Sequence, residues 1–415
     1  MSDHLPIIQP ARRLGNVQEY YFSKKLREIA AMRKQGFDVL NLGIGSPDLP
    51  PAPEVAELLG THTSQPDVHA YQSYNGIPEL RLAFAQWYQR FFGVSLNADS
   101  EILPLIGSKE GIVHIAMTFL EEGDVALVPN PGYPSYRAAS ELAGAQVVEY
   151  ELSEENGWLP NLAELEKMDL KKVKILWGNY PNMPTGARAK QSFFEELIAF
   201  GKKHKILIVN DNPYSFILND QHLSLLSIPG AMDVAMELNS LSKSHNMAGW
   251  RVGMLAGRAD YLTHVVRFKS NMDSGMFKPV QLAAAQALQA PQSWYDELNA
   301  IYRRRREKVF ELMEMLGCTW QPDAMGMFVW AKVPAAFKNG FELSEMLLER
   351  AHVFITPGGI FGSQGNPYIR ASLCSSEPVL ENAIARIRYR FSKKSSQATQ
   401  NSITQNSITQ NSKLP

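Results

Sequence analysis

The stretch Ser240-Leu-Ser-Lys243-Ser-His-Asn-Met-Ala-Gly-Trp-Arg251-Val-Gly253 is the most informative part of the sequence. A lysine stands between small polar residues, and an arginine follows eight positions later. A single lysine is usually a solvated surface charge. An amine that attacks a carbonyl carbon needs surroundings that lower its pKa, and a nearby cation helps. Arg251 and Ser240 also suit a phosphate monoester, because they offer a charged fork and a hydroxyl donor.

Upstream of this stretch, short apolar strands alternate with helical patterns. We expect strands at 102–106, 125–128, 147–150, 173–177 and 205–209, and helices at 108–121, 136–143 and 191–204. Such alternation is typical of an α/β fold with a mostly parallel sheet sandwiched by helices.

The pattern changes after about residue 289. A long charged helix (294–316) precedes strands at 326–333, 352–355 and 368–373, a helix at 342–351 and a last helix from Glu377. We therefore expect a large domain (48–290), a smaller α/β C-terminal domain (291–392) and an N-terminal segment (1–47) that packs with the small domain. We interpret the four arginines at 303–306 as a solvated helix face or a subunit contact.

The tail at 393–415 has a different composition. Its Gln-Asn-Ser-Ile-Thr repeat is too polar to bury enough apolar surface, so we expect it to be disordered.

Composition excludes several classes of function. The chain has 415 residues, 45% of them hydrophobic, and a formal net charge of −1, so no general electrostatic argument favours nucleic acid or an anionic membrane. The only cysteines, Cys318 and Cys374, have no metal-ligand spacing, which suits a reducing cytoplasm and argues against a zinc site. We see no secretion signal and no apolar run of membrane-spanning length.

The run from Ser240 to Arg251 resembles the lysine signature of the fold-type I, class I/II aminotransferases, which use pyridoxal phosphate. Motifs in that family's order extend over about residues 18–392. The resemblance implies that Lys243 holds the cofactor as a Schiff base and that Ser240 and Arg251 bind its phosphate.

Asp211-Asn-Pro-Tyr214 follows an expected strand. An aspartate in this place is commonly a turn or helix-cap residue. The resemblance implies instead that Asp211 pairs with the pyridine nitrogen, so that the ring acts as an electron sink. It also implies that Tyr214 donates to the cofactor's phenolic oxygen. Lys243, Asp211 and Tyr214 form the expected catalytic group.

Two further motifs belong to the expected cofactor site. Ile106-Gly107-Ser108-Lys109-Glu110-Gly111 lies where a strand passes into a helix, which is a favourable place for an anion. The resemblance implies that Gly107, Ser108 and Lys109 hold the phosphate. The sequence of this motif looks like that of the alanine and LL-diaminopimelate aminotransferase branch. In Asn130-Pro-Gly-Tyr133, the tyrosine is expected to stack on the ring, although a proline-rich surface turn is an alternative.

Tyr71 matches the family's tyrosine that reaches the phosphate of a neighbouring subunit. This implies a homodimer with shared active sites.

Arg370 lies in an expected apolar strand, where a cation is costly unless it is paired. Its planar fork suits a carboxylate, and the resemblance implies that it binds the substrate's α-carboxylate, with Ile44 and Gly45 donating from the backbone. Gly43 and Gly45 do not form a dinucleotide motif, because Asp48 stands where a third glycine is needed.

One position departs from the family, which usually reads Asn-Asn-Pro-Thr-Gly. Here the run is Asn182-Met183-Pro184-Thr-Gly, and a thioether cannot donate a hydrogen bond. Either Asn182 or a water reaches the phenolic oxygen, or Tyr214 serves alone. We assign Asn182 to the cofactor set and expect a raised pKa of the Schiff base.

The resemblance implies ping-pong transfer of an amino group from an L-amino acid to a 2-oxo acid, 2-oxoglutarate or pyruvate being our default acceptors. Alternatives on the same fold are a β-lyase, a decarboxylase or a non-catalytic regulator that binds the cofactor or an amino acid. Residues 271–277 contain no arginine, which weakly disfavours aspartate as the dedicated donor. We expect no metal.

Overall fold

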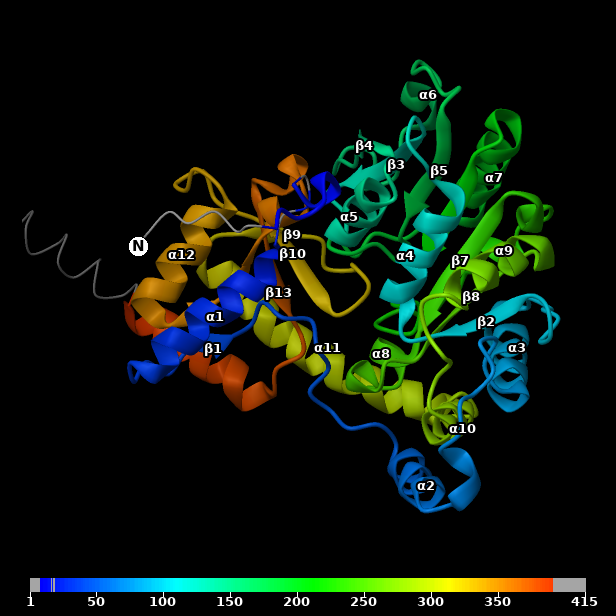
Figure 1. Cartoon of the computed structure of the whole chain (residues 1–415). Helices are drawn as coiled ribbons and strands as arrows, with labels where there is room; N and C mark the ends of the chain where they lie inside the picture. The colour runs from blue at the N-terminus through cyan, green and yellow to red at the C-terminus, as the bar shows by residue number, and fades with distance from the viewer. Residues whose placement is uncertain (1–7, 16, 18, 391–415) are drawn as a thin grey trace, which may run out of the picture.

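A computed structural model of the chain describes residues 8–15, 17 and 19–390 (Figure 1). The expected disordered tail at 393–415 lies outside the described residues, as do residues 1–7 of the N-terminal segment.

The larger of the two main sheets has seven strands. Their spatial order is β2 (Ile102–Leu105), β8 (Gly253–Gly257), β7 (Ala235–Ser240), β6 (Leu207–Asp211), β5 (Val173–Gly178), β3 (Val125–Asn130) and β4 (Gln146–Glu151). Only β8 runs antiparallel to its neighbours, β2 and β7. The sheet is therefore mostly parallel, as the sequence predicts.

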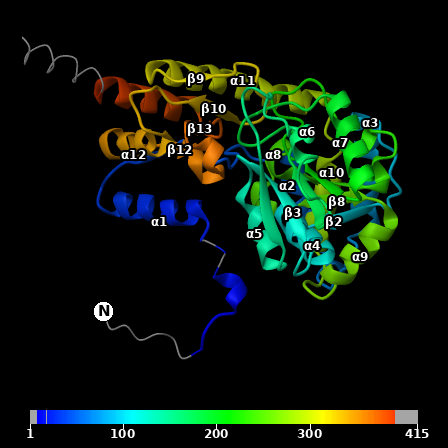
Figure 2. The ribbon, with the colours of Figure 1, turned by 90° about the horizontal axis from the view of Figure 1, so that it is seen from above.

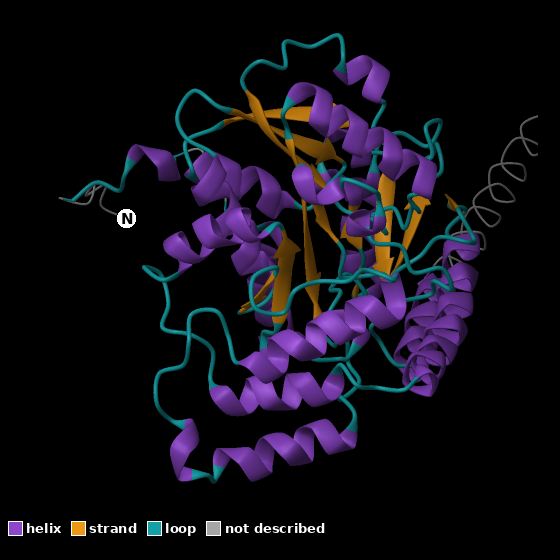
Figure 3. Ribbon diagram, turned by 90° about the vertical axis from the view of Figure 1, so that its right-hand side faces the viewer, coloured by secondary structure: helices purple, strands orange, loops and turns teal. Residues whose placement is uncertain are grey.

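Helices cover both faces of this sheet (Figure 3). Successive strand residues point to opposite faces, so Ile175 and Trp177 enter one core while Leu176 enters the other. The first core is completed by α4 (Ser108–Phe119), α5 (Pro134–Leu142) and α9 (Ala259–Lys269). The second contains α3 (Pro78–Phe92), α7 (Gln191–His204) and α10 (Lys278–Ala287). Burial on both faces explains why these strands are nearly all apolar.

A second, antiparallel sheet lies beside the first (Figure 2). Its strand order is β12 (Thr356–Pro357), β13 (Tyr368–Ser372), β10 (Phe328–Lys332) and β9 (Thr319–Trp320). The helices near it are α11 (Gln292–Met315), α12 (Gly340–Ala351) and the helical residues 377–390. In α11, Asn299 donates to the carbonyl of Phe216, so this helix also contacts the larger half of the molecule.

The N-terminal segment joins the second sheet. Strand β1 (Leu40–Asn41) pairs in parallel with β11 (Val353–Phe354), and in α1 (Tyr21–Lys34) the ammonium of Lys25 lies 2.7 Å from a carboxylate oxygen of Glu345 in α12. The domain boundaries that we expect from the sequence stay a prediction.

The remaining elements are short or peripheral. They are α2 (Pro53–Thr63), α6 (Leu162–Leu165), α8 (Leu241–Ser244), and the 3-10 turns η1 (Arg12–Leu14), η2 (Pro66–Val68), η3 (Leu225–Ser227), η4 (Ala231–Asp233), η5 (Ala248–Trp250), η6 (Gly358–Phe361) and η7 (Ser363–Gly365).

The arginine run in α11 differs in part from our interpretation. Arg305 is buried and donates to both carboxylate oxygens of Asp48, at 2.7 and 2.8 Å. Arg304 pairs with Glu377 at the surface. Arg305 faces inward because the helix repeat turns one of four consecutive residues toward the core.

Strand register decides where functional groups gather. Leu105 and Ser240 are both opposite Gly253. The ends of β2 and β7 and the start of β8 therefore meet at one edge of the sheet, the one formed by the carboxyl ends of the parallel strands. The parallel strands β5 and β6 end at this same edge. In α/β sheets, ligands bind beyond the carboxyl ends of the strands.

Candidate active site

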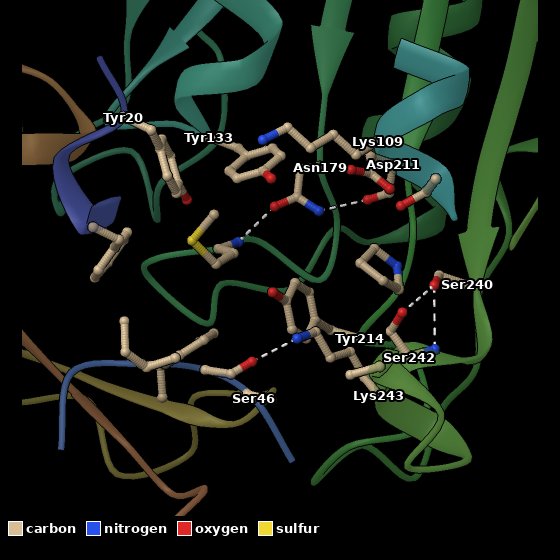
Figure 4. A pocket seen from close by; sticks show the side chains of 18 of the residues that line it. Tyr20, Ser46, Lys109, Tyr133, Asn179, Asp211, Tyr214, Ser240, Ser242 and Lys243 are labelled. Carbon is tan, nitrogen blue, oxygen red and sulfur yellow. Dashed lines mark hydrogen bonds between the residues drawn. The ribbon is translucent and has the colours of Figure 1, made fainter. Parts of the chain in front are cut away.

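A cavity of about 630 Å³ lies at this edge and is lined by residues from both halves of the molecule. Figure 4 shows Lys243, Tyr214, Asn179 and Asp211 around it. Lys243 comes from α8, directly after β7, and Asp211 ends β6.

Lys243 directs its amine into the cavity, where Nζ donates to the carbonyl oxygen of Gly45 at 2.5 Å. Burial lowers the pKa of this amine, and the nearby charges of Arg370 and Arg251 lower it further against an opposing effect of Cys374. A larger neutral fraction makes the amine a better nucleophile and base.

Asp211 is a buried carboxylate with a free oxygen. Its Oδ2 accepts from the hydroxyl of Tyr136 at 3.0 Å, while Oδ1 has no hydrogen-bond partner within the described part of the chain. Burial raises its pKa to about 7, Glu237 adds to the rise, and the Tyr136 hydrogen bond opposes it. Such a group is completed by a ligand that brings an N–H donor or a positive charge.

Hydroxyls and a guanidinium gather at the β2–α4 junction. Ser108, Ser240, Ser242 and Arg251 all line the cavity. Helix α4 has no side-chain cap at Gly107, and although the amide of Glu110 donates to Gly107 O, the amides of Ser108 and Lys109 at its start are open to an anion. Gly107 has φ +80°, and a Cβ there would lie 2.0 Å from Nη2 of Arg251. Only glycine lets this arginine approach the helix start.

Arg370 is a buried guanidinium that bonds to no carboxylate within the residues described. Nη2 donates to the carbonyl of Gly43 at 2.8 Å, Nη1 contacts Sδ of Met183 at 3.3 Å, and Nε has no partner. Burial lowers its pKa to about 10, so it stays charged at neutral pH. A buried cation with weak acceptors is a receptor for an anionic group.

Aromatic rings complete the cavity. Tyr133 and Tyr214 line it, and the ammonium of Lys109 lies 6.0 Å from the ring centre of Tyr133 and 4.9 Å from that of Tyr20. Burial raises the pKa of Tyr214, so its hydroxyl stays protonated and available as a donor.

The model of the family described as aminotransferase class I and II matches residues 38–387. The chain belongs to this family. Among curated relatives, LL-diaminopimelate aminotransferase of Dehalococcoides mccartyi is 43% identical over 379 residues, which cover 91% of this chain and 97% of the relative. The enzyme of that name from Moorella thermoacetica is 39% identical over 383 residues, which cover 92% and 98%. Among solved structures, apo-BacF from Bacillus subtilis matches with a TM-score of 0.88 and 36% identity, over 92% and 98% of the two chains.

These findings fix the class of reaction. The aminotransferase is a pyridoxal-phosphate enzyme of amino-acid metabolism, and the lyase, decarboxylase and regulator alternatives are not favoured by its relatives. No helix within the described residues is long and apolar enough to span a bilayer.

The residues of the cavity fit this cofactor on geometry of their own. The unpartnered Oδ1 of Asp211 can accept from a protonated pyridine nitrogen. The hydroxyls, the guanidinium of Arg251 and the uncapped helix α4 can take a phosphate. Lys243 offers the amine.

Most of the residues expected from the aminotransferase sequence come together. Those that line the cavity are Ile44, Gly45, Ser108, Lys109, Tyr133, Asp211, Tyr214, Ser240, Lys243, Arg251 and Arg370. Gly107 stands directly behind Arg251. Tyr71 is 90% exposed and is not a lining residue.

Asn182 differs from our expectation. It does not line the cavity: its Oδ1 accepts from Thr185 and its Nδ2 donates to the carbonyl of Asn179, so its amide is used within the turn. Asn179 lines the cavity instead and donates to the carbonyl of Asp211. Asn179 Oδ1 in turn accepts from the amide of Met183, so the side-chain amides of both asparagines are bonded within the protein, and the place of Asn182 in the cofactor set stays a prediction.

Several lining residues were not expected. Tyr136, Asn179 and Ser242 lie within or beside motifs quoted above, so their places in those motifs were a usable signal. Phe328 and Phe361 come from the second sheet and from η6, and apolar residues there carry no sequence signal that separates a site from a core.

Proposed function

We propose that the chain transfers an amino group from an L-amino acid to a 2-oxo acid in two half-reactions at this one cavity. The supporting observation is the placement of Lys243, Asp211 and Arg370 around a single space. Pyruvate and 2-oxoglutarate are the proposed acceptors. LL-diaminopimelate is the donor to compare with other amino acids, because curated relatives at up to 43% identity are named LL-diaminopimelate aminotransferase.

The proposed roles follow from the contacts. Bound pyridoxal phosphate supplies an electron sink for the bond that breaks at Cα. Asp211 Oδ1 holds a proton on the ring nitrogen, and Tyr136 keeps this carboxylate oriented through Oδ2. Tyr214 would donate from its hydroxyl to the cofactor's phenolic oxygen, and Asn179 lines the same cavity.

Arg370 and Lys243 act on the amino acid itself. Arg370 exchanges the weak acceptor Met183 Sδ for the α-carboxylate, which fixes the orientation of Cα. Lys243 Nζ, with its lowered pKa, would take the Cα proton as general base and deliver it as general acid to the cofactor's C4′ carbon, on the other side of the substrate nitrogen.

We also propose a homodimer in which Tyr71 enters the partner's site. Tyr71 is 90% exposed, and Tyr74, three residues later, is 43% exposed. Met272 and Phe277, in a second segment, are 61 and 42% exposed. The two segments touch, because a Cβ on Gly275 would lie 2.7 Å from the carbonyl oxygen of Gln72. Exposed apolar side chains of this kind mark an interface. A cytoplasmic location is proposed from the two unpaired, buried cysteines.

The test is a single-turnover screen. The purified yellow holoenzyme is mixed with one amino acid at a time, without any oxo acid, and its absorbance is followed. The proposal expects bleaching with one equivalent of 2-oxo acid per site, and none in Lys243→Ala. Persistent colour with release of ammonia, thiol or carbon dioxide would contradict it.

A further inference from the structure

The cavity has two unlike walls. One wall, built on the larger sheet, carries the groups assigned above to the cofactor, from Ser108 to Arg251. The other wall is built by α1, the loop at 44–46, β10, η6 and β13. The amino acid has to lie against this second wall, because Arg370 belongs to it.

The second wall is mainly apolar, although Ser23 and Ser46 also line it. Phe22 and Leu26 are four residues apart on α1 and therefore share one helix face. Phe22, Phe328 and Phe361 surround the guanidinium of Arg370, with ring centres 5.5, 3.9 and 4.7 Å from Cζ. Leu26 is 44% exposed yet lines the cavity, so an apolar surface faces open space where a ligand enters.

Charge is scarce on this wall. Among the described residues, Arg370 is the only charged one that lines this wall, and Asp211 on the opposite wall is the only acid that lines the cavity. Lys109 also belongs to the opposite wall, and its ammonium lies over the Tyr20 and Tyr133 rings. The segment at 69–77, which carries Tyr71, contains no acidic residue.

We infer that the second wall selects amino acids with a large uncharged side chain, of the phenylalanine, leucine or methionine class, over acidic donors and diaminopimelate. The inference rests on the proposed function, since it takes Arg370 as the receptor of the α-carboxylate. Once Arg370 binds the α-carboxylate, an apolar substrate side chain that rests on Phe22, Leu26 and Phe361 gains binding free energy from the loss of exposed apolar surface.

Diaminopimelate and glutamate would instead place a charged side chain against this wall. The far end of diaminopimelate carries an ammonium and a carboxylate, and no acid among the described residues lines the second wall to pair with that ammonium. A charge that loses water without gaining a partner costs binding free energy. Specificity by unpaired charge is usually stronger than specificity by lost apolar contact.

The first experiment compares single-turnover bleaching rates of the wild-type holoenzyme over a set of donors. Phenylalanine, leucine and methionine are expected to exceed alanine, glutamate and diaminopimelate by about tenfold or more in second-order rate constant. Fastest bleaching by glutamate or diaminopimelate, or equal rates for leucine and alanine, would overturn this inference alone. If none of the amino acids bleached the holoenzyme, the proposed function itself would be overturned.

A second readout needs no turnover. 3-Phenylpropanoate and glutarate lack an amine, so each binds the holoenzyme without reacting and raises its Tm according to affinity. The inference expects a Kd for 3-phenylpropanoate about tenfold below that for glutarate. The reverse order would contradict it.

The third experiment places a charge on the wall. Leu26→Asp should lower kcat/KM for phenylalanine about tenfold more than it lowers that for alanine, because only the larger side chain is inferred to rest on Leu26. Ala30→Asp is the matched control, since Ala30 is exposed, lies one turn further along α1 and does not line the cavity. Equal effects of the two substitutions on phenylalanine would refute the role of Leu26.

Discussion

Met183 changes the hydrogen bonds that its neighbours can make. It occupies the position where the family usually carries an asparagine, and its sulfur lies 3.3 Å from Nη1 of Arg370. The thioether is a weak acceptor, so a carboxylate displaces it from the arginine at little cost. Met183 also cannot donate a hydrogen bond to the cofactor's phenolic oxygen, as the asparagine usual in the family would.

The first prediction concerns this missing donor. Met183→Asn should lower the pH midpoint of the absorbance change of the bound cofactor by about one unit, the size of one hydrogen bond to a charged group. Met183→Leu keeps the buried shape without a donor and should leave the midpoint in place. An unchanged midpoint in Met183→Asn would show that the donor does not matter.

The second prediction uses the buried carboxyl of Asp211. Its pKa rises on folding from 3.8 to about 7, so the apoenzyme is stabilised by this group below pH 4 and loses that contribution as pH rises to 7. The loss is of the order of 4 kcal/mol at most. In the apoenzyme, the Tm of wild type relative to Asp211→Asn should fall between pH 5 and pH 8, and a constant difference would contradict the assignment.

At the scale of elements, alternation of strands and helices predicts five of the seven strands in the larger sheet, but not β7 or β8. Strand β7 contains Glu237, which looks polar in sequence yet is fully buried. Its carboxylate accepts from Tyr88, Ser224, Asn210 and the amide of Leu225, and these partners are distant in sequence. Local pattern cannot foresee a charge that is satisfied by tertiary contacts.

The residues of the site are also predictable from the sequence only in part. The groups carried by motifs, such as Lys243 and Asp211, are predictable because one short segment fixes each of them. Which amide of Asn179 and Asn182 turns into the cavity depends on the packing of their turn, and the sequence places both equally well.

A third prediction tests the β2–α4 junction. Gly107→Ala puts a Cβ 2.0 Å from Arg251 Nη2 and should raise the Kd for pyridoxal phosphate by about tenfold, a loss near that of one hydrogen bond to a charged group. Gly123→Ala is the control, because Gly123 also has a positive φ, +97°, but nothing lies within 4 Å of the added Cβ. Both variants should lose about 1–2 kcal/mol of stability. Equal Kd values, measured by cofactor titration of the apo forms, would remove the steric argument.

At the scale of the whole molecule, the proposed dimer makes a fourth prediction. Tyr71→Ala and Lys243→Ala are each expected to be nearly inactive. A mixed dimer of the two has one site with an intact lysine and an intact tyrosine from the partner, so co-expression should restore up to about one quarter of wild-type activity if subunits pair at random. No recovery in a preparation that light scattering shows to contain mixed dimers would contradict a shared site.

The pairing of β1 with β11 has a consequence for synthesis of the protein. Leu40 pairs with Val353, so the first strand leaves the ribosome long before its partner. The carbonyls of Gly43 and Gly45, which accept from Arg370 and Lys243, follow that strand directly. The larger sheet is complete at residue 257, whereas this loop is fixed only when residue 354 has been made. A nascent chain therefore carries a finished cofactor wall before it has a finished substrate wall, and its amino-acid pocket forms last.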